Sequence, residues 1–255
     1  MAQEEQNKQS LGEHLVALRR LLLRSAAAIG IAFLIVFYAF IDPLMSLITG
    51  PIVERGITVI YTEMSAALLT KLKVAIIAGA VVASPYVFWQ IWQFIKPALY
   101  AHEKRIFRVT FAAAVSLFLL GVVFCYVAVY FLAVDFFLIA GEDLATPMLA
   151  IDNYVDFLFG FVLPFGIAFE LPVALYITTR LGLTNYEMLA SKRRYVILAT
   201  VVVAAFLTPP DVVSQIMLSI PILLLFEISL QICKWVKPHS QTEAPEEDEE
   251  AQEEA

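Results

Sequence analysis

Six long apolar runs constrain the fold of this chain more than any other feature of its sequence. They cover residues 25–41, 74–95, 109–134, 157–179, 195–207 and 212–233. About 20 consecutive apolar residues cross the hydrocarbon core of a bilayer. Only 16% of the 255 residues are charged, whereas a soluble domain has about 25%. We therefore predict an all-α integral membrane protein with six transmembrane helices, and a soluble enzyme is excluded.

The run at 195–207 is unusually short. Its 13 residues would rise about 20 Å as a helix, less than the roughly 30 Å of a hydrocarbon core. Thr208, two prolines and Asp211 follow, and they must turn the chain. A short span predicts either local thinning of the bilayer or protection by a partner.

The Lys and Arg residues are distributed unevenly over the loops between the runs. Fourteen of the 17 fall on the side of the two termini, and only Arg55, Lys71 and Lys73 fall on the other. Because cytoplasmic loops carry the excess of Lys and Arg, both termini are predicted to be cytoplasmic, with the protein in the cell inner membrane. On the opposite face, the loops at about 43–70 and 135–156 are expected to form short interfacial helices that cap the bundle.

Both ends of the chain are polar. Ser10 and Glu13 match a capping box, which predicts the start of an amphipathic cytoplasmic helix. The last residues, 242–255, hold eight acids and no Lys or Arg. Such a segment cannot bury enough apolar surface to fold, so we expect a disordered, solubilising tail rather than a partner-binding arm. The predicted division is an N-terminal segment, a transmembrane domain and an acidic tail, at residues 1–20, 21–233 and 234–255.

Glu170 lies inside the fourth run, between Pro164 and Pro172. Prolines kink a helix and free backbone carbonyls, so a concave face with a single carboxyl is expected there. A protonated Glu that serves only packing is the alternative. We favour a function because an ionisable group at membrane depth is energetically costly.

Polar residues also cluster around the predicted turn between the last two runs. Asp211 is expected to cap the helix that follows Pro210. Thr208 and Gln215 could contact a partner helix in lipid, where polar side chains stabilise helix association.

The first cytoplasmic loop contains one acid, Glu103, among several cations. Lys104, Arg105 and Arg108 follow it closely. The carboxylate could pair with one of these cations, or it could accept a guanidinium group from a ligand. The residues alone leave these two interpretations equally open.

No pattern indicates a catalytic or metal site. Cys125 and Cys233 are far apart, the three His residues do not cluster, and no phosphate-binding loop occurs. We therefore expect no metal, no cofactor and no enzymatic activity, and no binding of nucleic acid.

Several motifs, in the right order, resemble the TatC family, the receptor subunits of the twin-arginine protein translocase. They are Phe94-Ile-Lys-Pro-Ala-Leu-Tyr-Ala-His-Glu103, His14-Leu-Val-Ala-Leu-Arg19, Gly50-Pro51-Ile, Ser84-Pro85, Phe165-Gly-Ile-Ala-Phe-Glu170-Leu-Pro172, Leu207-Thr-Pro-Pro-Asp211 through Gln215, and Ile220-Pro221 through Glu227. The resemblance covers about residues 10–237. It implies a glove-shaped bundle of six helices that binds twin-arginine signal peptides of folded precursors at the cytoplasmic face. Export would then use the proton-motive force and the single-span partners TatA and TatB, in an assembly with other copies of the chain and membrane lipid.

The resemblance also assigns roles to individual residues. Glu103 would accept the signal arginines, because a carboxylate reads a guanidinium in a bidentate manner that Lys cannot match. The residues expected to support Glu103 are Phe94, Pro97, Leu99, Tyr100, Glu13 and Arg19. Glu170 would line an intramembrane pocket, Thr208 and Gln215 would contact TatA or TatB, and Pro51 and Asp211 would shape the non-cytoplasmic cap and turn.

One position departs from the family pattern His-Leu-x-Glu-Leu-Arg. This chain has Ala17 where the family has a second glutamate. Glu13 lies four residues earlier and therefore on the same helical face. Either Glu13 supplies the second carboxylate, or Glu103 alone reads the arginine pair.

Two other classes of protein compete with this interpretation. A proton-coupled transporter of small solutes would use Glu170 as its proton carrier, but it should show paired broken helices and several midplane polar sites. A membrane enzyme would need a catalytic constellation at a common depth.

Overall fold

The structure is a computed structural model that describes residues 2–95, 104–141, 147–207 and 211–236. Side chains are described for 15–94, 108–141, 147–207 and 211–236. The chain divides into two compact units, Met1–Val115 with Glu142–Asp156, and Ser116–Gly141 with Phe157–Ala255.

Helices account for nearly all of the described chain, as the apolar runs predict. Five of them are long and apolar enough to cross a membrane, at Leu15–Glu54, Ala66–Phe94, Arg108–Gly141, Ile151–Arg180 and Val212–Trp235. The fifth predicted run, 195–207, corresponds to α9, Arg193–Leu207, which is not among these five; its 15 residues rise only about 22 Å. The all-helical membrane class is confirmed, and α9 is too short to cross an unperturbed bilayer alone.

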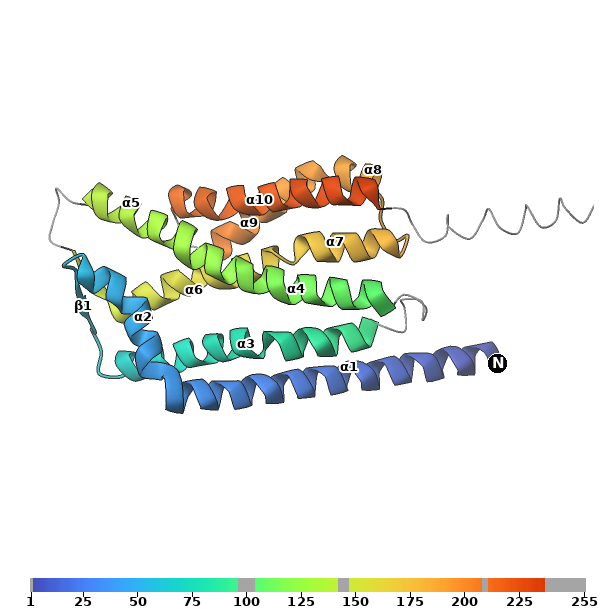
Figure 1. The fold of residues 1–255 in the computed structure, drawn as a ribbon, viewed down its shortest axis with the longest axis horizontal. Helices are drawn as coiled ribbons and strands as arrows, with labels where there is room; N and C mark the ends of the chain where they lie inside the picture. Colours follow the sequence, from blue (N-terminus) through green and yellow to red (C-terminus); the bar gives the residue numbers. More distant parts are fainter. Residues whose placement is uncertain (1, 96–103, 142–146, 208–210, 237–255) are drawn as a thin grey trace, which may run out of the picture. The chain divides into compact units, whose positions relative to one another are not determined.

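The first unit begins with helix α1, Ala2–Ile35, which packs along α3, Ala66–Ile95 (Figure 1). A methyl group added to Gly79 of α3 would lie 2.7 Å from the backbone nitrogen of Phe33 in α1. The two backbones therefore approach each other more closely than any residue with a Cβ atom would allow. Small residues permit such contacts between membrane helices.

The predicted capping box at Ser10 is wrong, because α1 starts at Ala2, eight residues earlier. Ser10 and Glu13 consequently lie inside the helix. The residues before Ser10 are mostly Glu, Gln, Lys and Ala, which all have high helix propensity. The helix also continues without a break past residue 20.

A π-helical turn, η1 (Val36–Phe40), joins α1 to α2, Ile41–Glu54. Phe40 leaves helical geometry, with φ −126° and ψ 2°. Pro43 follows three residues later; a proline cannot donate a backbone hydrogen bond, and its ring clashes with a carbonyl four residues before it. The chain therefore changes direction here, and α2 leaves the line of α1 (Figure 1).

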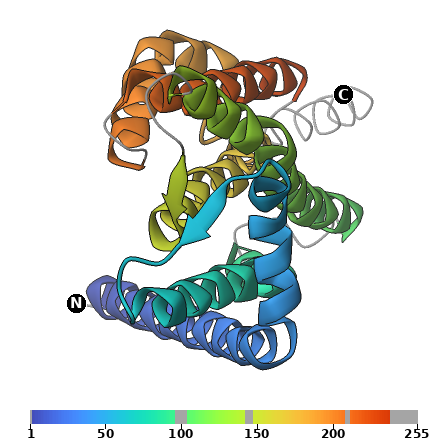
Figure 2. The same cartoon turned by 90° about the vertical axis from the view of Figure 1, so that its left-hand side faces the viewer.

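Two short strands close the same end of the first unit. Strand β1, Thr58–Ile60, pairs in parallel with β2, Met148–Ala150 (Figure 2), with Val59 opposite Leu149. The first predicted cap helix is α2. The second expected cap segment instead holds β2 and the start of α6, Ile151–Ala168, because its backbone groups pair with β1.

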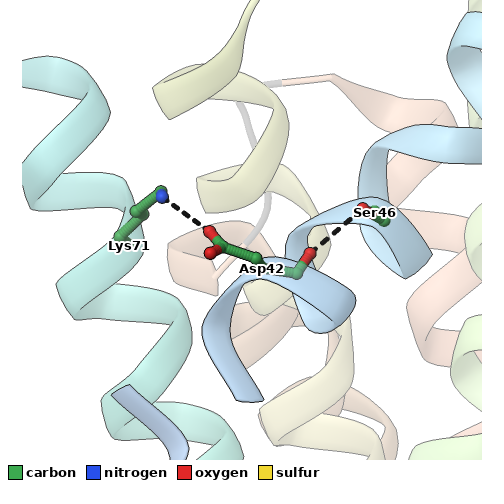
Figure 3. Close-up of polar contacts among 3 residues, drawn as sticks. All are labelled: Asp42, Ser46 and Lys71. Carbon is green, nitrogen blue, oxygen red and sulfur yellow. Dashed lines mark hydrogen bonds and ion pairs between the residues drawn. The ribbon is translucent and has the colours of Figure 1, made fainter. Parts of the chain in front are cut away.

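Ion pairs hold α2 and α6 to the first turns of α3. Lys71 Nζ lies 2.8 Å from Asp42 Oδ1, and the Ser46 hydroxyl donates to the Asp42 carbonyl (Figure 3). Lys73 Nζ lies 2.8 Å from both carboxylate oxygens of Asp156. The buried Tyr154 hydroxyl donates to the Ile48 carbonyl at 2.8 Å. The cap is thus tied to the helices by contacts that the sequence did not reveal.

In the second unit, α10, Val212–Trp235, packs against α7, Leu171–Arg180, and α9. The buried side chains of Leu218 and Leu230 belong to this core. The remaining elements are α4, Lys104–Phe124; a π-helical turn η3, Cys125–Tyr130; α5, Phe131–Gly141; and α8, Tyr186–Ser191. The Tyr130 ring of η3 lies tilted against the Phe157 ring of α6, with centroids 5.9 Å apart. Within α6, Phe157 and Phe161 meet edge to face, with centroids 5.0 Å apart.

The contact at Gly79 predicts a large difference between two glycines on facing helices. Gly79→Ala should lower the free energy of unfolding by about 1–3 kcal/mol, because α1 and α3 must move apart. Gly30→Ala is the matched control, since no atom lies within 4 Å of the added methyl, and it should be neutral or stabilising by up to about 1 kcal/mol. Thermal unfolding in detergent, followed by circular dichroism, measures both. Equal melting temperatures would contradict the close contact.

Candidate functional site

Glu170 lies at a break between two helices of one membrane span. Helix α6 ends at Ala168 and α7 begins at Leu171. Pro172 has no backbone N–H, and its ring would clash with the carbonyl of Ala168 in a continuous helix. The backbone turns instead, with the Glu170 N–H donating to the Ile167 carbonyl at 3.0 Å. The predicted interruption of the fourth span is confirmed.

Aromatic packing fixes the residues before this break. A methyl on Gly121 of α4 would lie 2.8 Å from Phe169 Cγ and 2.9 Å from the Phe165 carbonyl oxygen. The Phe124 ring lies 6.0 Å from that of Phe165 and 5.6 Å from that of Phe169. The backbone that carries Glu170 is therefore packed against α4, and this packing fixes the position of the Glu170 Cα atom.

The Glu170 side chain is half-buried. Its Oε1 atom is inaccessible to solvent and has no hydrogen-bond partner among the described residues. Ten residues separate Glu170 from Arg180 at the end of α7, or about 15 Å of helix. A buried acceptor without a partner costs about 1–3 kcal/mol, so this carboxyl is an acceptor available to a donor from another molecule.

The turn before α10 is organised by Asp211. Its side chain accepts from the Ser214 backbone N–H at 2.6 Å, as predicted for an N-cap. Gln215 Nε2 donates to the Val201 carbonyl at 2.9 Å. Gln215 thus links α10 to α9 and retains its amide oxygen as an acceptor. Thr208 lies outside the described residues.

A glycine that none of the sequence motifs includes supports this turn. A methyl on Gly160 of α6 would lie 2.7 Å from the Leu207 carbonyl oxygen, at the end of α9. A glycine within an apolar span is the signal that could have indicated a close helix contact. The end of α9 is therefore positioned by α6.

The residues predicted to bind a signal peptide belong to the first unit. Phe94 is half-buried in the last turn of α3, and Arg19 is exposed on α1. Four residues of the loop (Pro97, Leu99, Tyr100 and Glu103) lie outside the described residues, as does the side chain of Glu13. Their mutual arrangement stays a prediction.

Pro51 lies in the last turn of α2, where its carbonyl accepts from Arg55 Nη1 at 3.1 Å. It therefore belongs to the cap of the first unit, on a different element from Asp211. Cys125 and Cys233 are buried free thiols. Among the described residues, no group of three or more His, Cys, Asp or Glu could hold a metal ion.

The chain is similar to known proteins over most of its length. The family model described as Sec-independent protein translocase protein (TatC) matches residues 13–221. A relative from Carboxydothermus hydrogenoformans, named Sec-independent protein translocase protein TatC, is 37% identical over 92% of this chain and 96% of its own. The protein of the same name from Escherichia coli (strain K12) is 34% identical over 88% of each chain.

Two solved structures are similar to this chain in both fold and sequence. A crystal structure of the twin-arginine translocase receptor TatC aligns with a TM-score of 0.81 and 38% identity, and covers 87% of this chain and 98% of that one. A second one, determined in DDM, has the same TM-score and 39% identity. A small-solute transporter finds no support in these similarities. The resemblance predicted from the motifs is confirmed: this chain belongs to the TatC family of Sec-independent protein translocase proteins.

Proposed function

We propose that this chain is the receptor subunit that recognises twin-arginine signal peptides of folded precursor proteins at the cytoplasmic face of the inner membrane. Together with TatA and TatB it would support their export, driven by the proton-motive force. The observation that carries this proposal is the position of Glu103, which precedes the three cations Lys104, Arg105 and Arg108 at the start of α4, inside the region matched by the family model.

The charges of the first unit support a cytoplasmic location of both termini. The three cations of the opposite face are Arg55, Lys71 and Lys73. Lys71 and Lys73 pair with Asp42 and Asp156, and Arg55 donates to a backbone carbonyl. The positive-inside rule counts Lys and Arg and gives little weight to Asp and Glu, so the excess of 14 cations over these three supports a cytoplasmic location of the termini.

Recognition of arginine is assigned to Glu103. A carboxylate accepts two parallel hydrogen bonds from a guanidinium group, and such charge-assisted pairs are stronger than neutral ones. Lys offers a point charge without this geometry. Glu13 is proposed to supply the second carboxylate in place of the residue absent at Ala17, and Phe94, Pro97, Leu99, Tyr100 and Arg19 would complete the site.

Contacts with TatA and TatB are assigned to the second unit. The buried Oε1 of Glu170, which has no partner among the described residues, and the amide oxygen of Gln215, whose Nε2 donates to Val201, are acceptors that a partner could use. A partner helix or a signal hairpin with a donor side chain would satisfy them, since polar groups stabilise helix association in lipid. Thr208 would add a hydroxyl beside Gln215, and Asp211 and Pro51 would shape the turn and the cap.

Photo-crosslinking of a labelled twin-arginine signal peptide to membranes that carry this protein tests the receptor site. Glu103→Ala should reduce the crosslink at least tenfold, because a charge-assisted bond worth about 1.5–3 kcal/mol is lost. Glu13→Ala should reduce it by a smaller factor. A peptide with Lys-Lys in place of the two arginines should crosslink to the native protein as weakly as the twin-arginine peptide crosslinks to Glu103→Ala.

Arg20→Gln is a control on the exposed face of α1 that leaves both carboxylates in place, and it should crosslink normally. A crosslink that is insensitive to Glu103→Ala and to Lys-Lys would overturn the receptor proposal. Normal export by Glu13→Ala would remove only the compensation assigned to Glu13.

Replacing Glu170 should separate function from stability. Glu170→Leu removes a buried acceptor that has no partner among the described residues, so the melting temperature should stay equal or rise. Export of a twin-arginine precursor and crosslinking to TatB should nevertheless fall about tenfold, whereas Glu170→Gln, which keeps an acceptor oxygen, should fall less. Loss of export together with a lower melting temperature would instead indicate a packing role.

The contact between Gly160 and Leu207 predicts a positional effect on partner binding. Gly160→Ala should displace the end of α9, cost about 1–3 kcal/mol of stability and weaken crosslinking of TatA or TatB to α10. Gly141→Ala adds a methyl with no atom within 4 Å and serves as the control. Partner crosslinks that are unchanged in Gly160→Ala would show that the turn does not need this support.

A further inference from the structure

One end of the second unit carries a cluster of cations that its own acids do not neutralise. Lys192 and Arg194 flank the start of α9, and Lys234 lies in the last turn of α10. We call these three exposed residues the basic surface. In the described part of the unit, this end holds five cations (Arg180, Lys192, Arg193, Arg194 and Lys234) and two acids (Glu187 and Glu227), a net charge of +3 (5 − 2).

The contacts of the basic surface leave its charge in place. Glu227 is engaged in an ion pair with Arg193, at 3.0 Å. Lys192 and Arg194 lie 5.4 Å and 4.9 Å from the centre of the Tyr195 ring, and Lys234 lies 6.0 Å from that of Tyr186. An aromatic ring orients a cation without cancelling its charge.

These contacts place the three cations on neighbouring parts of the α9–α10 hairpin. Arg193 pairs with Glu227 of α10, so its chain neighbours Lys192 and Arg194 lie at the start of α9 beside α10. Lys234 lies seven residues beyond Glu227 on α10, or about 10 Å farther along the helix axis. All three cations therefore belong to the end of the hairpin from which the C-terminal segment leaves.

The chain carries a complementary segment directly after this surface. Helix α10 ends at Trp235, and eight acids without any Lys or Arg occur between Thr242 and Ala255. Glu243 is eight residues from Trp235, a separation that spans at most about 28 Å when the chain is fully extended. The first acid of the tail thus follows Lys234 closely in the sequence, and the other acids have longer tethers.

We propose that the acidic C-terminal tail binds the basic surface of its own chain. Tethering gives the tail an effective concentration in the millimolar range, so a free acidic peptide would need a millimolar concentration to compete with it. The two charge sets have opposite sign and lie on the same side of the membrane whatever the orientation of the chain, because the tail follows α10 without another span. The tail is then an intramolecular competitor of anionic lipid headgroups for Lys192, Arg194 and Lys234.

The test uses the full chain in nanodiscs of neutral phosphatidylcholine, with a benzophenone amino acid in place of Gln252. Crosslinked peptides are identified by mass spectrometry at about 50 mM and about 500 mM salt, since screening weakens exposed ion pairs. Crosslinks to residues 186–195 and 230–236 are expected at low salt, with at least a fivefold loss at high salt. The same loss is expected for Lys192→Gln/Arg194→Gln/Lys234→Gln and for a tail in which all eight acids are amides.

Arg20→Gln/Arg24→Gln/Arg108→Gln removes the same number of exposed cations from the first unit and should leave the crosslinks unchanged. Crosslinks only to the first unit, or only to lipid, would overturn the proposal. So would crosslinks to residues 186–195 that respond neither to salt nor to Lys192→Gln/Arg194→Gln/Lys234→Gln. Size-exclusion profiles of all variants exclude misfolding as the cause of a loss. Replacing a third of the lipid with phosphatidylglycerol should reduce the crosslinks, and an increase would contradict competition.

Discussion

The hydrocarbon core of a bilayer offers no hydrogen-bond partner to the peptide backbone, and the rest of this structure depends on that constraint. Helices satisfy their own N–H and C=O groups, so a break within a span is tolerated only where other groups replace the lost bonds. The two breaks that matter here follow this rule. At Phe40 a π-helical turn precedes Pro43, and at Glu170 a tight turn precedes Pro172. Both redirect the chain without leaving a long unpaired segment in lipid.

Association of the helices within the membrane also requires close contact between them. Lipid tails are as apolar as the side chains, so burial alone does not bring helices together. Gly79, Gly121 and Gly160 each lie where a methyl group would come within 3.0 Å of another element. The first of these joins α1 to α3, the second supports Glu170, and the third positions the turn before α10. The elements that carry the proposed partner contacts are thus held by glycines that make no contact with a partner themselves.

Some charged groups of this chain have hydrogen-bonding or ionic partners within it, and one group inside a membrane span has an atom without such a partner among the described residues. Lys71, Lys73 and Arg193 have carboxylate partners within the chain, and these pairs fasten the cap and the α9–α10 hairpin. Glu170 lies within a membrane span, and one of its oxygens is buried without a partner among the described residues. Natural proteins rarely leave such a group unsatisfied without a reason. Assembly with another helix is the simplest way in which this TatC-family chain could satisfy it.

The sequence by itself determined the membrane class, the places of the spans, the break at Glu170 and the N-cap at Asp211. These features depend on local composition, on proline and on residues a few positions apart, which act the same way in any fold. The motifs around Glu103 and Glu170 also sufficed to indicate the family. Only the tertiary structure decided the parallel pairing of β1 with β2, the bond from Gln215 to Val201 and the contact of Gly160 with Leu207. Each joins segments whose proximity results from packing of the whole unit, and no local propensity encodes that proximity.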